Sequence, residues 1–353
     1  MPTTASKAST QAKRRRSRQQ AHGHTATADS SREGKFLPSL RAFPRKKRQI
    51  IRLSRFVNLG CQLPKHIERK IMARPTGPIT VCVINLKGGV GKSTISTLLA
   101  RHAFNFKRSD VLAIDLDPQA NLSQALMRNG YGAFLRGKRP SIVEIFNGYL
   151  PPHAGASKPG ALPGAAAIET IIEVDGRSLQ LVPSRFDFAD NLTNALRPDP
   201  RVLAKYLAGN FANKDLIIID CAPTESILTR AAYHASGKVL VPVKPEFFAT
   251  IGFPLLNRSL EDFRRQNLGQ TIEVAGVVIN NAFYDGGNGG GPEKGAAMAD
   301  IKTEAAKNSW PIFKNELPFS RGFPKMMRGD YSYRGNSTQF KYFAEEFFNT
   351  IGL

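Results

Sequence analysis

The chain has 353 residues, of which 50 are Lys or Arg and 28 are Asp or Glu, so its formal net charge is +22. Hydrophobic residues make up 41% of it, which is enough for a sizeable core and excludes a wholly disordered chain. Its three cysteines lack metal-ligand spacing and are too few for a disulfide framework, and no apolar run is long enough to span a membrane. Such a basic chain is typical of proteins with a polyanionic partner, most often nucleic acid.

The positive charge is concentrated near the N-terminus, since residues 1–71 hold 18 of the Lys and Arg residues and only three acids. We expect this segment to be a basic, disordered extension, because residues 1–35 carry almost no large apolar side chains. Residues 36–71 have scattered apolar positions, which would allow a short basic helix to form on a polyanion. Alternatively, translation starts at Met72. In either case we expect residues 72–353 to form the globular domain.

From Ile79 onward, short apolar runs alternate with helical patterns. Runs rich in β-branched residues predict strands buried on both faces, and alternation with helices predicts a parallel sheet. The sequence therefore predicts an α/β fold, in which a mainly parallel, twisted sheet has helices on both faces. The predicted strands are 79–84, 111–114, 179–182, 216–219, 239–243 and 274–279. The predicted helices are 93–104, 122–127, 200–208, 225–235 and 254–266, and the predicted surface loops are 151–166 and 286–291.

A glycine-rich turn between the first predicted strand and helix carries the strongest chemical signal. It matches a P-loop, in which backbone N–H groups and the N-terminus of the next helix bind phosphate oxygens. In this pattern Lys92 reaches the β- and γ-phosphates of ATP, and the Ser93 hydroxyl ligates Mg²⁺. Leu86 replaces the usual first glycine and Lys87 follows it, so this is a variant loop with a second lysine. The predicted nucleotide-binding residues are Lys87, Gly88, Gly89, Val90, Gly91, Lys92, Ser93 and Thr94.

Two further motifs place carboxylates at strand ends, where parallel sheets bind their ligands. The second predicted strand leads into Asp115-Leu-Asp117, and alternation puts both acids on one side of the backbone, able to face phosphate and metal. A helix cap would explain one of these acids but not both. The apolar run 216–219 ends in Asp220, like a Walker-B strand whose carboxylate holds the hydration shell of Mg²⁺. Ser93 and Asp220 are therefore the predicted metal ligands.

These motifs, in this order, resemble the ParA/Soj/MinD group of deviant-Walker P-loop ATPases, over roughly residues 79–345. The segment Leu240-Val-Pro-Val-Lys-Pro-Glu246 is similar to the family's strand and loop after the Walker-B acid. The chain departs from the family in having Ala222-Pro223 where ParA proteins commonly have two prolines. The family also usually has a shorter segment at the position of Asn281-Ala-Phe283 and the glycine-rich loop.

The resemblance implies roles for particular residues. Lys87 would be the signature lysine that crosses an ATP-bound dimer and touches the phosphates of the opposite subunit. Asp117 would orient the attacking water, and Asp115 would support the metal shell. Asn280 and Pro318 would lie at the strand ends that frame adenine.

Within this group the sequence favours the ParA-like branch. Residues 340–353 carry one lysine and two glutamates, a poor match to an anionic membrane, so we expect this helix to pack on the core. An iron–sulfur relative would need paired cysteines, which the chain lacks. ParA-like proteins bind DNA without sequence preference, although an ordinary solvated loop is the alternative reading of the basic segment here. The candidate DNA-binding residues are Arg321, Lys325, Arg328 and Arg334.

The resemblance implies a slow ATPase, with ATP and Mg²⁺ as cofactors, that partitions a plasmid or chromosome. It would be cytoplasmic and nucleoid-associated, form a homodimer on ATP, bind non-specific DNA, and be stimulated by a ParB-like centromere-binding protein. No membrane partner is expected. The alternative is a positioning or DNA-transfer accessory scaffold that uses the same ATP switch. A metabolic P-loop enzyme is a third possibility, but the chain carries no substrate motif for it.

Overall fold

The structure, a computed structural model, describes residues 77–137, 139–147, 167–186, 199–246, 249–281, 292–318, 325 and 334–353. All of these belong to one compact unit, residues 64–353. The other unit, residues 1–63, lies outside the described residues. The same holds for the domain boundary predicted at residues 71–72 and for the predicted loops 151–166 and 286–291.

An eight-stranded sheet, in the order β3-β4-β2-β5-β1-β6-β7-β8, forms the centre of the described unit. Every neighbouring pair except β3–β4 is parallel. The predicted fold class is therefore confirmed. The strands are β1 (Ile79–Val83), β2 (Val111–Asp115), β3 (Glu169–Val174), β4 (Arg177–Val182), β5 (Leu216–Asp220), β6 (Lys238–Val243), β7 (Glu273–Asn281) and β8 (Leu317–Pro318).

The central strands form where the sequence is apolar and β-branched. Every residue of β2 and β5 is buried, as expected for strands covered on both faces. The strand β3 was not predicted. It pairs antiparallel with β4 through a tight turn at Asp175-Gly176, where both residues have positive φ. The strand β8 has only two residues, too few for a pattern, and its position at Pro318 was expected from the resemblance alone.

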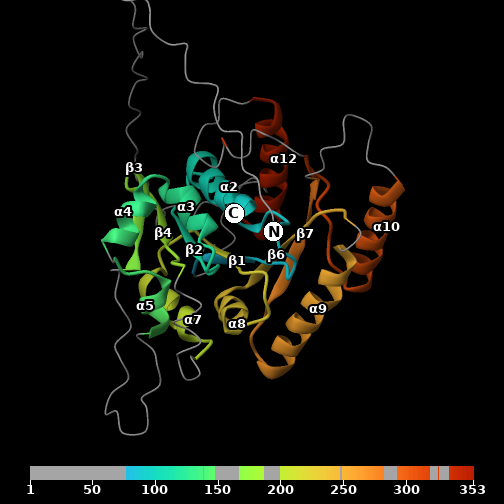
Figure 1. Ribbon diagram of the computed structural model, residues 1–353, viewed down its shortest axis with the longest axis horizontal. Coiled ribbons are helices and arrows are strands. Elements are labelled where there is room, and N and C mark those ends of the chain that lie inside the picture. Colours follow the sequence, from blue (N-terminus) through green and yellow to red (C-terminus); the bar gives the residue numbers. More distant parts are fainter. Residues whose placement is uncertain are drawn as a thin grey trace, which may run out of the picture. The chain divides into compact units, whose positions relative to one another are not determined.

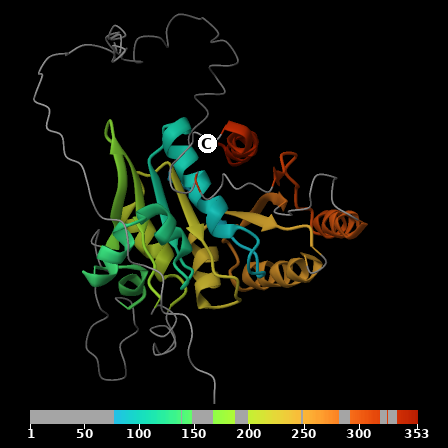
Figure 2. The same ribbon diagram turned by 45° about the horizontal axis from the view of Figure 1, so that its top comes forward.

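Helices cover both faces of the sheet (Figures 1 and 2). One apolar core joins the sheet to α5, α7, α8, α9 and α10, and a second joins it to α2, α3 and α12. The helices α4, α5 and α10 were not predicted, and α9 begins five residues before its predicted start. The helices are α2 (Lys92–His102) with a π-helical continuation (Ala103–Lys107), α3 (Asn121–Met127), α4 (Gly130–Arg136), α5 (Ile142–Asn147), α7 (Val202–Asn210), α8 (Ile227–Ala235), α9 (Ala249–Gln266), α10 (Pro292–Lys307) and α12 (Arg334–Ile351).

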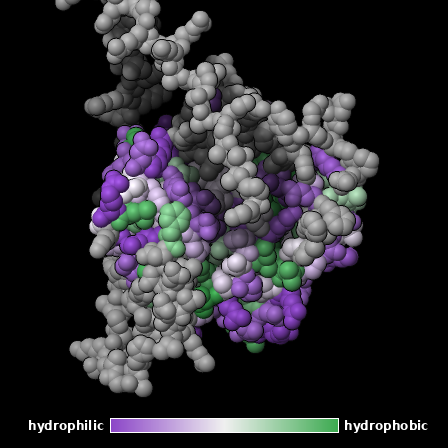
Figure 3. Space-filling view, in the orientation of Figure 1, coloured by the Kyte–Doolittle hydropathy of each residue, from purple (hydrophilic) through white to green (hydrophobic). Residues whose placement is uncertain are grey.

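The C-terminal helix α12 packs on the core, as predicted. Its aromatic side chains at 340, 343, 347 and 348 are all buried, and they join the cluster that includes α2 and β1. None of the helices among the described residues is long and apolar enough to cross a membrane. In the view of Figure 3 the described surface is mainly hydrophilic, with small separate hydrophobic areas.

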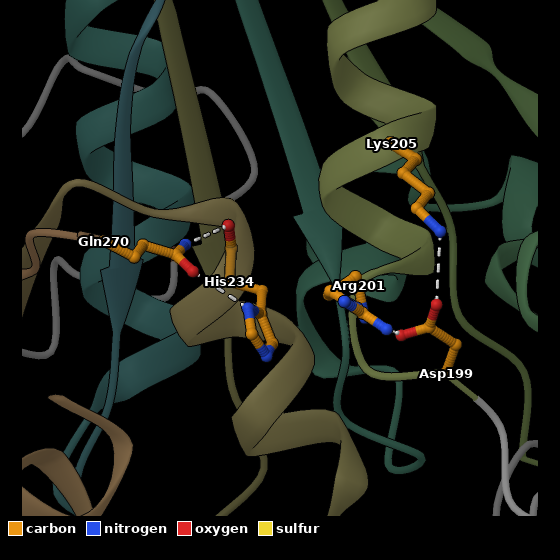
Figure 4. Close-up of polar contacts among 5 residues, drawn as sticks. All are labelled: Asp199, Arg201, Lys205, His234 and Gln270. Atoms are coloured by element: carbon orange, nitrogen blue, oxygen red, sulfur yellow. Dashed lines mark hydrogen bonds and ion pairs between the residues drawn. The ribbon is translucent and has the colours of Figure 1, made fainter. Parts of the chain in front are cut away.

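Polar contacts fix the ends of α7 and α8 (Figure 4). Asp199, just before α7, accepts hydrogen bonds from the backbone and side chain of Arg201 and from Lys205 Nζ. Burial opposes ionisation of Asp199, but these donors outweigh it and hold its pKa at about 2. At the end of α8, the His234 ring contacts Gln270 Oε1, and Gln270 Nε2 donates to the His234 carbonyl. These contacts tie α8 to the segment before β7.

Candidate nucleotide-binding site

The predicted P-loop connects β1 to α2 at the carboxyl end of the sheet. Gly89 and Gly91 have φ of 72° and 93°, a left-handed conformation that side chains disfavour. At Gly91 a Cβ would also collide with Asn280 Nδ2, so a side chain there would have to displace the Asn280 amide. The glycines therefore let the chain curl tightly and start α2 there, which directs the N-terminus of that helix at the loop.

Asn280 supports the P-loop from β7. Its Nδ2 donates to the Val90 carbonyl at 2.9 Å, and the residue is 8% exposed. In the sheet Asn280 pairs with Leu317, and the next pair joins Asn281 to Pro318. The structure thus brings Asn280 and Pro318 to adjacent strand ends. Their contact with adenine stays a prediction.

Lys92, which is predicted to bind the ATP phosphates, is buried within the P-loop. Its Nζ donates to the Lys87 carbonyl at 3.0 Å, and the residue is only 6% exposed. Burial lowers the pKa of Lys92, while the nearby carboxylates Asp220 and Asp117 act in the opposite direction. An anion entering the loop would add to these carboxylates and favour the charged ammonium.

Asp220 lies at the tip of β5, next to both neighbouring strands. It pairs in register with Val83 of β1 and Asp115 of β2. Its Oδ1 accepts a hydrogen bond from Ser96 Oγ at 3.1 Å, whereas its buried Oδ2 has no partner among the described residues. Burial raises the pKa of Asp220 to about 7 and the charge of Asp117 adds to this, while hydrogen bonds from Ser93 and Ser96 act in the opposite direction. A buried, unsatisfied carboxylate oxygen beside a phosphate loop suits an oxygen-liganded cation such as Mg²⁺.

Both carboxylate oxygens of Asp115 accept hydrogen bonds from the protein. Its Oδ1 accepts the Asp117 N–H at 3.1 Å, and its Oδ2 accepts the backbone and hydroxyl of Ser123 at 2.8 and 2.7 Å. It is fully buried, and burial together with Asp220 raises its pKa well above the ordinary value. The carboxylate thus fixes the turn after β2 against α3. These contacts give Asp115 a positioning role, and its support of the metal shell stays a prediction.

Asp117 and Lys87, the other two predicted catalytic residues, are held by different partners. Asp117 is 7% exposed, and its Oδ1 accepts the Gln119 N–H at 2.9 Å. Lys87 Nζ donates to Glu246 Oε2 at 2.8 Å. Within the described chain, therefore, the second lysine contacts an acid of its own subunit.

Sequence reasoning missed four residues that shape this site. Ser96 and Ser123 bind the two buried acids, Asn85 binds the Lys87 backbone, and Glu246 binds the Lys87 side chain. Glu246 stands in the 240–246 segment that carried the resemblance, so its position was available as a signal. The serines gave none, because buried helical serines resemble ordinary packing positions.

The candidate DNA-binding residues are only partly described. Lys325 is exposed, and Arg334 is the first residue of α12, although its side chain is not described. Arg321 and Arg328 lie outside the described residues. Binding of DNA by these side chains stays a prediction.

Comparison with known proteins agrees with this site. The model of a family described as AAA domain matches residues 79–274, more than half of the chain, and these residues include the P-loop and all three strand-end acids. The chain belongs to this family and is a ParA/MinD-like P-loop ATPase.

Its relatives include partition proteins. The chain is 31% identical over 209 residues to the chromosome partitioning protein ParA of Caulobacter vibrioides, which is 59% of this chain and 71% of that protein. It is 29% identical over 201 residues to ParA of Myxococcus xanthus, which is 56% of this chain and 63% of that protein, less than two thirds of its length.

Solved structures show the same fold. A variant of McdA from Cyanothece, solved as an ATP complex, superposes with a TM-score of 0.62 at 20% identity, over 78% of this chain and 97% of that chain. At this identity the likeness shows the fold alone. The P-loop ATPase family of the chain thus rests on the family match, and the fold on both comparisons.

Proposed function

We propose that this P-loop ATPase is an ATP-dependent, DNA-associated enzyme that partitions a plasmid or chromosome. The observation that carries the proposal is a phosphate loop with two lysines, Lys92 and Lys87, placed beside the strand-end acids Asp117 and Asp220. The Caulobacter and Myxococcus relatives, both named chromosome partitioning ParA, support the biological role.

The P-loop would hold the ATP phosphates by charge and backbone together. The N-terminus of α2 contributes its partial positive charge, and Lys92 contributes a full one within the same loop. Asp220 and Ser93 would hold Mg²⁺, for which the unsatisfied Oδ2 of Asp220 is a fitting ligand or hydration-shell acceptor. When bound, this ion supplies charge neutralisation for the phosphates.

Hydrolysis would depend on a group brought by a second subunit. Asp117, held by the Gln119 backbone, would orient the attacking water. Lys87 would cross the dimer and stabilise the charge that develops on the opposite phosphates. Because this charge is delivered only in the dimer, intrinsic turnover should be slow and open to stimulation by a ParB-like protein.

DNA would be held through phosphate contacts and without base readout. The exposed Lys325 and the other basic candidates would serve the ATP dimer, and the predicted basic extension would add contacts whatever nucleotide is bound. A cytoplasmic, nucleoid-associated protein would result.

Turnover of ATP tests the proposal directly. We expect slow phosphate release that rises when non-specific duplex DNA and the ParB-like protein are added together. Asp117→Ala should still bind ATP and dimerise but turn over poorly, whereas Lys87→Ala should fail to dimerise. Fast turnover by a wild-type monomer, indifferent to DNA and partner, would contradict the proposal.

A further inference from the structure

Glu246 joins the P-loop to the segment between β6 and α9. Its Oε2 accepts a hydrogen bond from Lys87 Nζ at 2.8 Å, and its Oε1 lies 3.9 Å from Lys244 Nζ. The Lys87 and Glu246 side chains are 24% and 34% exposed, so water partly screens the pair. The Glu246 N–H also donates to the Lys244 carbonyl, which shapes the turn after β6. The ammonium of the second lysine is thus directed toward its own subunit.

Asn85 ties the backbone of Lys87 to β6, the strand that leads into this segment. Its Oδ1 accepts the Lys87 N–H at 2.9 Å, and its Nδ2 donates to the Pro242 carbonyl of β6 at 2.8 Å. The first turns of α9 approach closely here, since a Cβ on Gly252 would lie 2.9 Å from Asn85 Oδ1. Asn85 therefore fixes where the Lys87 side chain starts, and Glu246 fixes where its charge ends. A substitution of Glu246 therefore removes the partner of the Lys87 ammonium and leaves the Asn85 contact with the Lys87 backbone in place.

We propose that Glu246 is a positioning residue that holds Lys87 on its own subunit and sets how readily the lysine is released to a second copy of the chain. This inference rests on the proposed function, in which Lys87 acts across an ATP dimer. A carboxylate and a phosphate compete for the same ammonium, so the contact with Glu246 has to be broken before Lys87 reaches the opposite phosphates.

The size of the effect follows from the exposure of the pair. A partly exposed ion pair contributes a factor of roughly 1.4 to 5 to an equilibrium, and a symmetric dimer breaks two such pairs. Removing the acid should therefore lower the dimer dissociation constant by roughly 2- to 25-fold. Glu246 thus raises the dimer dissociation constant by this factor and does not prevent dimerisation.

Sedimentation velocity of the full chain with a slowly hydrolysed ATP analogue tests this. Glu246→Gln keeps the size of the side chain and removes its charge, so we expect a dimer roughly 2- to 25-fold tighter than wild type. Glu246→Asp keeps the charge on a shorter side chain and should fall between the two. Glu273→Gln is the matched control, since it removes an exposed acid that pairs with Lys238 at the other end of β6, and it should match wild type. An unchanged or weaker dimer in Glu246→Gln, with folding confirmed by its melting temperature, overturns the inference.

A double variant separates positioning from a general structural effect. Glu246→Gln combined with Lys87→Ala should behave like Lys87→Ala alone, because no ammonium remains to be released. A dimer regained in the double variant would show that Glu246 acts without Lys87 and would overturn the inference. A wild-type chain that stays monomeric with the analogue contradicts the proposed function, and the inference with it. Dimerisation that needs Lys87 but ignores Glu246→Gln contradicts the inference alone.

Discussion

Lys92 shows how single residues of this site balance charge against burial. A lysine that is 6% exposed has lost most of its contact with water, which lowers its pKa. Asp220 and Asp117 partly offset this cost, and the Lys87 carbonyl accepts a hydrogen bond from Nζ. The nearby carboxylates compensate the charge of this ammonium only in part. The phosphates of ATP would supply further negative charge, so their binding is favoured.

Replacing Lys92 removes the main point charge of the phosphate site. We expect Lys92→Ala to weaken ATP binding at least about 100-fold, since hydrogen bonds to charged groups contribute about 1.5–3 kcal/mol each and the ammonium donates more than one to the phosphates. Isothermal titration with ATP and Mg²⁺ measures this. Lys238→Ala, at the far end of β6, removes an exposed lysine as a control and should bind like wild type. Undiminished affinity in Lys92→Ala would remove the P-loop assignment.

At the scale of elements, α12 shows how a chain terminus is held by packing. Its buried aromatic side chains join the core formed with α2 and the sheet, and Phe313, just before β8, stacks edge-on against two of them. On the other side of the helix, Tyr342 is 58% exposed. The helix therefore presents one apolar face to the core, and its stabilising contribution should come almost entirely from that face.

Two aromatic substitutions on α12 compare these faces. Phe347 is fully buried, so Phe347→Ala should lower the free energy of unfolding by about 3–5 kcal/mol through lost burial and the cavity left behind. Tyr342→Ala removes a side chain of similar size from the surface and should cost about 0.5 kcal/mol. Urea unfolding followed by circular dichroism measures both. Equal losses in the two variants would contradict the packing of α12.

The elements also show which parts of the fold the sequence could predict. The buried strands β1, β2 and β5 were predictable because a strand covered on both faces needs a continuous apolar, β-branched run. The edge strand β3 escaped because its alternation is irregular and half of its residues are exposed, although Asp175-Gly176 was a usable hairpin signal. The short β8 depends on pairing with β7, which no local pattern encodes.

The candidate site also has parts that the sequence could predict and parts that it could not. The P-loop was predictable because its backbone geometry requires glycines at fixed spacing, and Asp220 because it ends an apolar strand. The hydrogen bonds of Asn280 with Val90 and of Lys87 with Glu246 join segments 190 and 159 residues apart in the sequence, and that of Asp115 with Ser123 joins β2 to α3. Such partners follow from tertiary packing, which no local pattern of the sequence encodes.

At the scale of the whole molecule, charge is distributed unevenly along the chain. Residues 1–71 hold 18 of the 50 Lys and Arg residues, while the rest of the chain is more nearly balanced. Contacts between these residues and DNA phosphates would weaken steeply with salt and would not depend on nucleotide. Affinity for DNA alone therefore does not reveal the ATP switch. The difference in DNA affinity between nucleotide states reveals the switch, because the charge of residues 1–71 is the same in each state.

The ratio of DNA affinities in two nucleotide states tests the central claim most directly. We would measure, at one salt concentration, the dissociation constant of the full chain for a fluorescent duplex of arbitrary sequence, first with a slowly hydrolysed ATP analogue and then with ADP. We predict binding about 5- to 150-fold tighter with the ATP analogue, the usual range of coupling between two sites, and a ratio near one for Lys87→Ala. Equal dissociation constants for the wild-type chain in the two states would contradict an ATP-switched, DNA-associated ATPase.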